Sequence, residues 1–284
     1  MPEKIPLGCI GNKKNELKLL IPIIKENIKP DDIFVEPFCG SCIVSYNVFK
    51  NCNINKFHLN DLNNLRIDFY NNMLDENKRN ELYKIEEEIK EKGEEEYYKY
   101  VKKNKKENFN NYWSHIISLR IHSFRHGLFP TNRKIILSKI PDKWIELFNK
   151  SIITCEDWKE TLNKYKDNEN AFIYLDPPYL DSYNASYNQY QKSHDENAFI
   201  IDNTKIYIDI LEYLKNAKCK ILFSINKNAI TEHIYKDYIK NQYLKRYDMN
   251  AKRTGTKENF TTKKGNVLII SNFVSNNDNI EKES

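Results

Sequence analysis

Apolar and polar positions along the chain follow two periods. From Lys14 to Asn27 apolar side chains recur at intervals of three and four residues, which predicts an amphipathic helix. This stripe consists of Leu17, Leu20, Ile21, Ile24 and Ile28. A second helical stripe consists of Tyr207, Ile210, Leu211 and Leu214. Short apolar runs predict strands, and they lie at residues 33–35, 56–60, 151–155, 171–175, 220–224 and 266–273.

Strands that alternate with helices predict an α/β fold with a parallel, Rossmann-like sheet. Ligands bind outside the carboxyl ends of the strands in such sheets. Polar residues lie directly after these strands, and they are Glu36, Asp61, Asp157, Asp176 and Asn226. We therefore expect a ligand site at this edge of the sheet.

Residues 74–150 have a different composition. An acidic, charge-dense stretch is followed by "KKNKK" and then by the basic, aromatic segment "SLRIHSFRHGLFPTNRK". We predict that this part is a mostly helical module, inserted into a discontinuous domain made of residues 1–73 and 151–275. The polar residues 276–284 are expected to form a flexible tail.

Composition narrows the class of protein. The chain has 284 residues with 45 Lys and Arg against 40 Asp and Glu, a net charge of +5 that is compatible with a polyanionic partner. No stretch approaches the roughly 20 apolar residues of a membrane span, and no signal peptide is evident, so we expect a cytoplasmic protein, in the host cytoplasm if it is viral. The six cysteines are dispersed, which predicts reduced thiols and no metal site.

The segment "FVEPFCGSC" (34–42) has two interpretations. Its Cys39 and Cys42 form a C-x-x-C pair, which is typical of redox sites, and a helix beginning near Ser41 would lower a thiol pKa. The same segment is also a strand, an acidic residue, Phe-x-Gly and then a helix, an order typical of a loop that holds a nucleotide-like cofactor. A thioredoxin-like site usually has Trp beside its first cysteine, whereas Phe38 precedes Cys39 here, and the chain is long for that fold. We favour the cofactor loop.

The segment "DPPY" (Asp176–Tyr179) follows the predicted strand 171–175. Its two prolines donate no backbone hydrogen bond and fix their own φ angles, so the turn is stiff. The turn presents a carboxylate, unpaired backbone carbonyls and an aromatic ring together. These groups suit a planar base with an exocyclic amine, because the oxygens accept its N–H groups while the ring stacks on its face.

These motifs, in this order, resemble those of the Dam-like, alpha-arrangement family of S-adenosylmethionine-dependent DNA adenine-N6 methyltransferases. The similar segments are "GNK" (11–13), "FVEPFCGS" (34–41), "LNDLN" (59–63), "YLDPPYL" (174–180) and "SYNASYNQY" (182–190). The resemblance therefore covers most of the chain and is weakest in the 74–150 insert.

The resemblance implies S-adenosylmethionine as cofactor. Glu36 would meet its ammonium group, Asp61 its ribose hydroxyls, and Gly40 would let the backbone approach its methionine part. Lys13 would contact its carboxylate or lie at the mouth of the site, while Trp158 would either stack on the adenine or pack in the core. The implied cofactor-binding residues are Cys9, Gly11, Asn12, Lys13, Glu36, Pro37, Phe38, Cys39, Gly40, Ser41, Asp61, Asp157, Trp158 and Asp176.

The resemblance also implies catalysis at Asp176, Pro177, Pro178 and Tyr179 on an adenine flipped out of double-stranded DNA. DNA contacts are expected from Arg120, Arg125, His126, Arg133 and Lys134.

The chain departs from the family pattern at Cys42, where a second glycine is common, and at Cys9, where Trp or Tyr is common. Methylation of RNA or another nucleobase, and a catalytically weak cofactor- and DNA-binding protein, stay open as alternatives. The biological role, such as restriction-modification, regulation or viral DNA modification, and the oligomeric state are not specified by the sequence.

Overall fold

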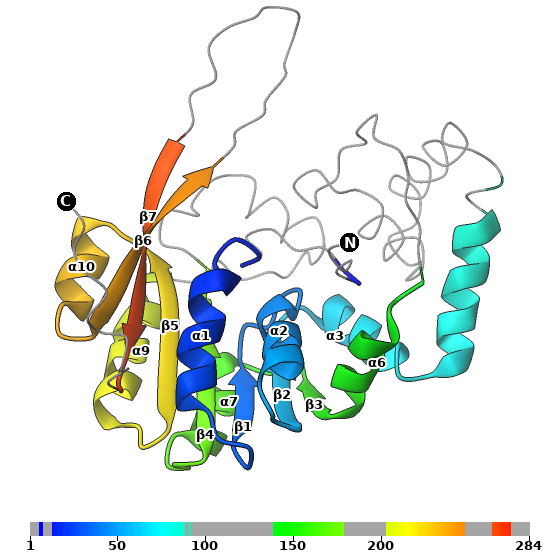
Figure 1. Ribbon diagram of the computed structural model, residues 1–284, viewed down its shortest axis with the longest axis horizontal. Coiled ribbons are helices and arrows are strands. Elements are labelled where there is room, and N and C mark those ends of the chain that lie inside the picture. The colour runs from blue at the N-terminus through cyan, green and yellow to red at the C-terminus, as the bar shows by residue number, and fades with distance from the viewer. Residues whose placement is uncertain are drawn as a thin grey trace, which may run out of the picture.

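A seven-stranded sheet forms the centre of the protein in a computed structural model that describes residues 6–7, 13–88, 91, 139–178, 203–247 and 263–273 (Figure 1). Its order is β3-β2-β1-β4-β5-β7-β6. The strands are β1 Ile33–Glu36, β2 Lys56–Asn60, β3 Ser151–Thr154, β4 Ala171–Leu175, β5 Lys220–Asn226, β6 Ile239–Tyr247 and β7 Lys263–Ser271. Strands β1 to β5 run parallel, and β7 is antiparallel to both of its neighbours. The predicted α/β fold with a Rossmann-like, methyltransferase-type sheet is confirmed.

Helices cover both faces of this sheet (Figure 1). The labelled helices are α1 Leu17–Asn27, α2 Ile43–Asn51, α3 Asn64–Asn72, α6 Asp142–Asn149, α7 Trp158–Tyr165, α9 Asn203–Asn216 and α10 Ala229–Tyr235, and residues 76–88 are also helical. Helices α1, α2, α3 and α6 pack on one face, and α7, α9 and α10 pack on the other. The stripe predicted for α1 is confirmed, because Leu20 and Ile24 are fully buried.

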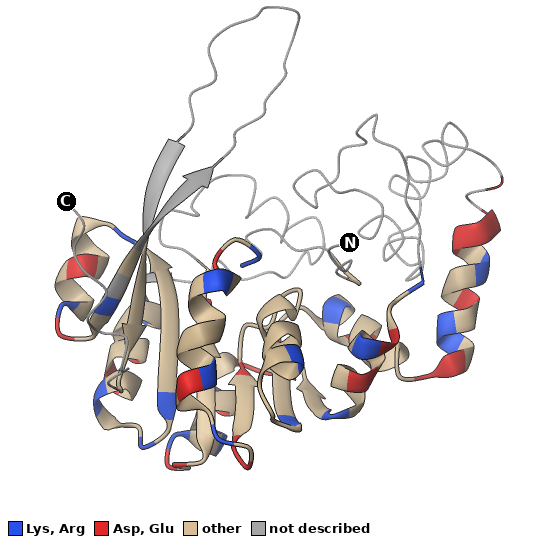
Figure 2. Cartoon of the chain, in the orientation of Figure 1, with Lys and Arg blue, Asp and Glu red and all other residues tan. Residues whose placement is uncertain are grey.

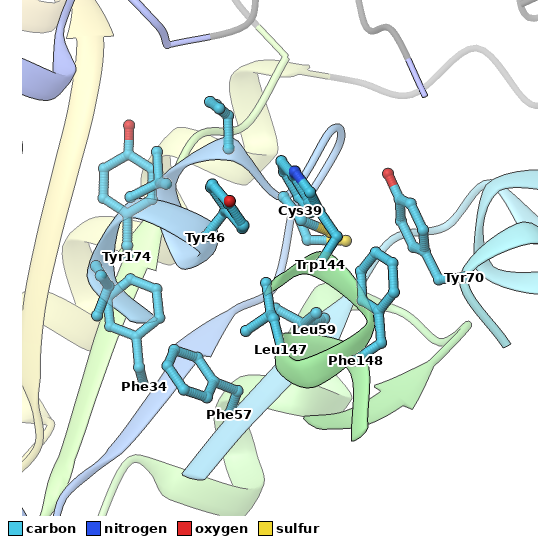
Figure 3. Close-up of a cluster of buried hydrophobic side chains, with 14 of the residues drawn as sticks. Phe34, Cys39, Tyr46, Phe57, Leu59, Tyr70, Trp144, Leu147, Phe148 and Tyr174 are labelled. Atoms are coloured by element: carbon cyan, nitrogen blue, oxygen red, sulfur yellow. The ribbon is translucent and has the colours of Figure 1, made fainter. Parts of the chain in front are cut away.

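Neighbouring strand residues contribute to opposite cores, as the pleat of a strand requires. Phe34 and Tyr174 lie in the first core, which Figure 3 shows between the sheet and α2 and α6. Val35 and Ile173 lie in the second core, beneath α7 and α9. Because both faces are buried, the central strands are continuous apolar runs in the sequence.

Two parts of the chain differ from the simplest interpretation of the sequence. Strand β6 was not predicted, because "IKNQYLKRY" has no apolar run, and its position at the edge of the sheet tolerates polar residues. Helix α6, inside the predicted 74–150 insert, contributes Trp144, Leu147 and Phe148 to the first core. Residues 92–138 of that insert lie outside the described residues, so the domain division stays a prediction.

The strand order reverses between β1 and β4. From β1 the chain builds β2 and β3 on one side, and it then returns to place β4 on the other side. Such a switch point leaves a crevice at the carboxyl ends of the two strands, where α/β proteins bind ligands. Glu36 is the last residue of β1 and Asp176 is the first residue after β4, so both predicted site residues lie at this switch point.

Candidate active site

Three ionisable residues meet at the switch point. Lys13, just before α1, forms an ion pair through its Nζ with Oδ1 of Asp176, 163 positions away in the sequence. The Lys13 side chain is only 2% exposed and that of Asp176 is 20% exposed. Glu36 is 3% exposed, and both Asp176 and Lys13 lie close enough to affect its pKa. The lysine expected at the cofactor or at the mouth of the site is thus paired with the predicted catalytic carboxylate.

Glu36 is held by helix α2. The backbone N–H of Ser45, at 3.2 Å, and the Ser45 hydroxyl both donate to Oε2 of Glu36. Burial raises the pKa of Glu36 to about 8; the bonds from Ser45 oppose this, Asp176 adds to it and Lys13 weakly opposes it. Glu36 is therefore mostly protonated at pH 7. Ser45 was not among the predicted site residues, since nothing in its sequence position marks it as a partner of β1.

The loop between β1 and α2 contains two left-handed residues. Gly40 has a φ of 49° and Cys42 a φ of 55°. A residue with a Cβ adopts this conformation at a cost of roughly 1–2 kcal/mol, whereas glycine does so freely. Cys42 stands where a second glycine is common in the family pattern. Its left-handed backbone is the conformation that glycine adopts most easily, so the loop has this conformation although the residue is a cysteine.

Asp61 connects this loop to the end of β2. Its Oδ2 accepts from the backbone N–H of Gly40 at 2.9 Å, and its Oδ1 accepts from the backbone N–H of Asn63 at 2.9 Å. Nε of Arg66 lies 3.8 Å from Oδ2. The side chain is 20% exposed. Each carboxylate oxygen has a second lone pair, so Asp61 can hold the loop and still accept further hydrogen bonds.

Trp158 contacts the loop between β1 and α2 through Phe38. Its ring centroid is 5.6 Å from that of Phe38 and 5.8 Å from that of Tyr213. Trp158 is 7% exposed and belongs to the second core. Asp157 caps helix α7 by accepting from the backbone N–H of Lys159 at 2.8 Å. Core packing of Trp158 is therefore present, and its contact with an adenine stays a prediction.

The C-x-x-C pair does not have the properties of a redox site. Cys39 and Cys42 are buried free thiols. Burial, with further contributions from Cys42 and from the nearby carboxylates, holds the pKa of Cys39 well above its usual range. The expectation that the helix start lowers the thiol pKa is wrong for Cys39, because desolvation outweighs the helix. A protonated thiol is a poor nucleophile, so this cysteine is a packing residue.

A tyrosine supports the turn after β4. The hydroxyl of Tyr207 on α9 donates to the carbonyl of Pro178 at 2.8 Å, and the hydroxyl of Tyr235 donates to the carbonyl of Tyr207 at 2.7 Å. Pro177 and Pro178 are thereby fixed to helix α9. In the sequence Tyr207 stands out only as part of an apolar helical stripe. Its hydroxyl was the available signal, since a buried tyrosine usually needs a hydrogen-bond partner.

Several predicted residues lie outside the described part of the chain. They are Cys9, Gly11, Asn12, Tyr179, Arg120, Arg125, His126, Arg133 and Lys134. On the described elements, basic and acidic residues are interspersed (Figure 2). Within the described ranges there is no His, Cys, Asp or Glu cluster suited to a metal ion. No described helix has the length and apolar character required to cross a membrane.

Comparison with known proteins agrees with this geometry. No curated protein matches the chain significantly. The family model of the D12 class N6 adenine-specific DNA methyltransferases matches residues 10–126 and 124–254. These matches include the loop after β1, the end of β2 and the turn after β4. Because they span most of its length, the chain belongs to the D12 class of N6 adenine-specific DNA methyltransferases.

Proposed function

We propose that this protein transfers a methyl group from S-adenosylmethionine to the N6 amine of an adenine flipped out of double-stranded DNA. The observation that carries the proposal is the position of Asp176. This carboxylate lies at the switch point of the sheet, directly before two prolines and beside Glu36 and Lys13. Family membership supports the reaction class.

The buried carboxyl group of Glu36 supports a cationic cofactor. Glu36 holds its proton because it is buried, while Asp176 is paired with Lys13. A positively charged group beside Glu36 would offset the cost of desolvation and stabilise the ionised carboxylate. S-adenosylmethionine has an ammonium and a sulfonium group, so the residues present fit it. When bound, it supplies a methyl group activated by a cationic sulfur.

The described residues suggest how each part of this cofactor is held. Glu36 would accept from the ammonium group, and Asp61 would accept from the ribose hydroxyls with its remaining lone pairs. Phe38 and Trp158, which contact each other, offer apolar surface for the adenine ring. Gly40 has no Cβ and a left-handed backbone, which allows a ligand to approach the loop closely.

Asp176 and the turn after it would orient the target amine. The N6 lone pair is delocalised into the ring, so the amine is a poor nucleophile. Hydrogen bonds from its two hydrogens to the Asp176 carboxylate and the Pro177 carbonyl would favour a pyramidal nitrogen with an available lone pair. The bound cofactor would supply the methyl group, and its sulfur would keep the electron pair of the bond that breaks. Asp176 would accept the proton that N6 releases and pass it to water.

The test is the transfer of labelled methyl groups to random-sequence duplex DNA, followed by identification of the modified base and its flanking sequence. Asp176→Asn should reduce turnover about 100-fold or more, which is typical when one preorganised polar group is removed from a transition state. Asp167→Asn is the matched control, because this exposed aspartate precedes the same strand at its other end. Unchanged turnover in Asp176→Asn, or methyl transfer to RNA but not to DNA in a parallel reaction, would contradict the proposal.

A further inference from the structure

A buried polar network lies on the second face of β2. His58 and Asn60 are two residues apart, so both side chains point towards the face that α7 covers. They are 1% and 0% exposed. Their neighbours Phe57 and Leu59 point the other way, into the first core. Polar side chains at such depth need partners, and these two form a continuous chain of hydrogen bonds.

Asn60 is fully hydrogen-bonded. Its side-chain Nδ2 donates to the carbonyl of Pro37 at 3.1 Å and to the carbonyl of Glu156 at 3.0 Å. Its Oδ1 accepts from the backbone N–H of Glu156 at 3.0 Å and from the Thr154 hydroxyl at 2.9 Å. Its backbone carbonyl accepts from the N–H of Cys39 at 2.8 Å. The backbone partners have fixed polarity, so they determine the orientation of the amide.

The rest of the network follows from this orientation. The Thr154 hydroxyl gives its hydrogen to Asn60, so it accepts from Nε2 of His58 at 2.8 Å. Nδ1 of His58 is then an acceptor, and the hydroxyl of Tyr165 on α7 donates to it at 2.9 Å. A neutral imidazole fits this arrangement, and burial lowers the pKa of His58 to about 4. The hydrogen bonds therefore follow one direction, from the Tyr165 hydroxyl on α7 through His58, Thr154 and Asn60 to the carbonyl of Pro37.

Asn60 joins two loops that would both line the proposed cofactor site. Pro37 and Cys39 belong to the loop that contains Phe38, and Glu156 directly precedes Asp157 and Trp158. We propose that Asn60 is a positioning residue that sets the distance between these two loops, and that Thr154 and His58 hold its amide in place. Asn60 itself would make no contact with the cofactor through its saturated amide. This inference rests on the proposed function, because the ligand whose adenosine part lies between the loops is S-adenosylmethionine.

The first test compares two asparagines whose side-chain amides both bond to backbone groups. Asn272 accepts from the backbone N–H of Ile221 at 2.8 Å and donates to the carbonyl of Cys219 at 3.0 Å, so both of its partners lie in one segment at the amino end of β5, away from the two loops. Asn60→Ala and Asn272→Ala should each lower the melting temperature. Titration with S-adenosylmethionine should show a dissociation constant raised about tenfold or more for Asn60→Ala, the equivalent of one or two net hydrogen bonds, and unchanged for Asn272→Ala. Equal cofactor affinity in Asn60→Ala and the unaltered chain would overturn the inference.

A second pair of variants keeps the question open to experiment if Asn60→Ala does not fold. Thr154→Val keeps the branched shape and removes the hydroxyl, while Thr154→Ser restores the hydroxyl. The network would be supported if Thr154→Val bound the cofactor more weakly than the unaltered chain while Thr154→Ser bound it as tightly. It would be refuted if Thr154→Val and Thr154→Ser bound the cofactor equally well. Failure of the unaltered chain itself to bind S-adenosylmethionine would instead overturn the proposed function, and this inference with it.

Discussion

Replacement of Glu36 by Gln should stabilise the protein, and the effect should grow with pH. Burial raises the pKa of Glu36 from 4.5 to about 8. Between these values the folded protein binds more protons than the unfolded chain, so the free energy of unfolding falls as the pH rises from 4.5 towards 8. Gln does not titrate, and its carbonyl can still accept from the Ser45 N–H and hydroxyl. The free energy of unfolding of Glu36→Gln should therefore not fall in this way as the pH rises.

The size of the effect follows from the two pKa values. They differ by about 3.5, and each pH unit corresponds to about 1.4 kcal/mol, so the carboxyl group costs about 5 kcal/mol once the pH exceeds 8. At pH 7 the unfolded chain has already lost this proton while the folded chain keeps it, and the cost is about 3 kcal/mol. Below pH 4.5 both states are protonated, and the cost disappears.

Urea unfolding at pH 4, 7 and 9 without cofactor would measure this difference. Glu36→Gln and the unaltered chain should have similar unfolding free energies at pH 4 and should diverge at pH 7 and 9. Glu169→Gln is a suitable control, because Glu169 is exposed before β4. Parallel stability curves for Glu36→Gln and the unaltered chain between pH 4 and 9 would refute the reasoning and would mean that Glu36 is ionised in the folded protein.

Two further predictions concern the loop after β1 and the turn after β4. Cys42 has a left-handed backbone, so Cys42→Gly should be more stable than Cys42→Ala by about 1 kcal/mol in urea unfolding, and equal stabilities would contradict the assigned φ of 55°. Tyr207→Phe removes the hydrogen bond to Pro178 and should reduce methyl-transfer turnover about tenfold, whereas Tyr235→Phe should lower the melting temperature with turnover unchanged. Equal turnover in these two tyrosine variants would show that the bond to Pro178 does not position the turn.

Much of the fold could be predicted because its core strands are buried on both faces. The runs at β2 and β4 match the observed strands residue for residue, and Asp176 was expected at the carboxyl end of β4, where the structure has it. Strand β6 could not be predicted in this way, because an edge strand with polar side chains has no apolar run. Its pairing with β7 depends on backbone hydrogen bonds, which leave no periodic signal in the sequence.

The partners of the site residues were harder to predict than their positions. Strand ends indicated where Glu36 and Asp176 would lie, but the ion pair of Asp176 with Lys13 joins residues from distant parts of the chain. The partnership of Glu36 with Ser45 depends on how α2 packs over β1. Neither contact follows from hydrophobic periodicity. Periodicity indicates which face of a helix or strand is buried, but not which side chain of another element packs against that face.

The charges at the switch point also bear on how a DNA methyltransferase would admit its substrates. With Glu36 protonated and Asp176 paired with Lys13, the switch point has no net positive charge that could offset the desolvation of a phosphate. A neutral adenine carries no charge and can approach Asp176 without this penalty, provided that its phosphates stay outside. Under the proposed function, flipping the base out of the helix achieves this separation, since the base enters the crevice while the backbone remains at the surface. A centre without net charge would thus favour an extruded base over an intact duplex, and the basic residues expected to hold the phosphates belong to the predicted insert.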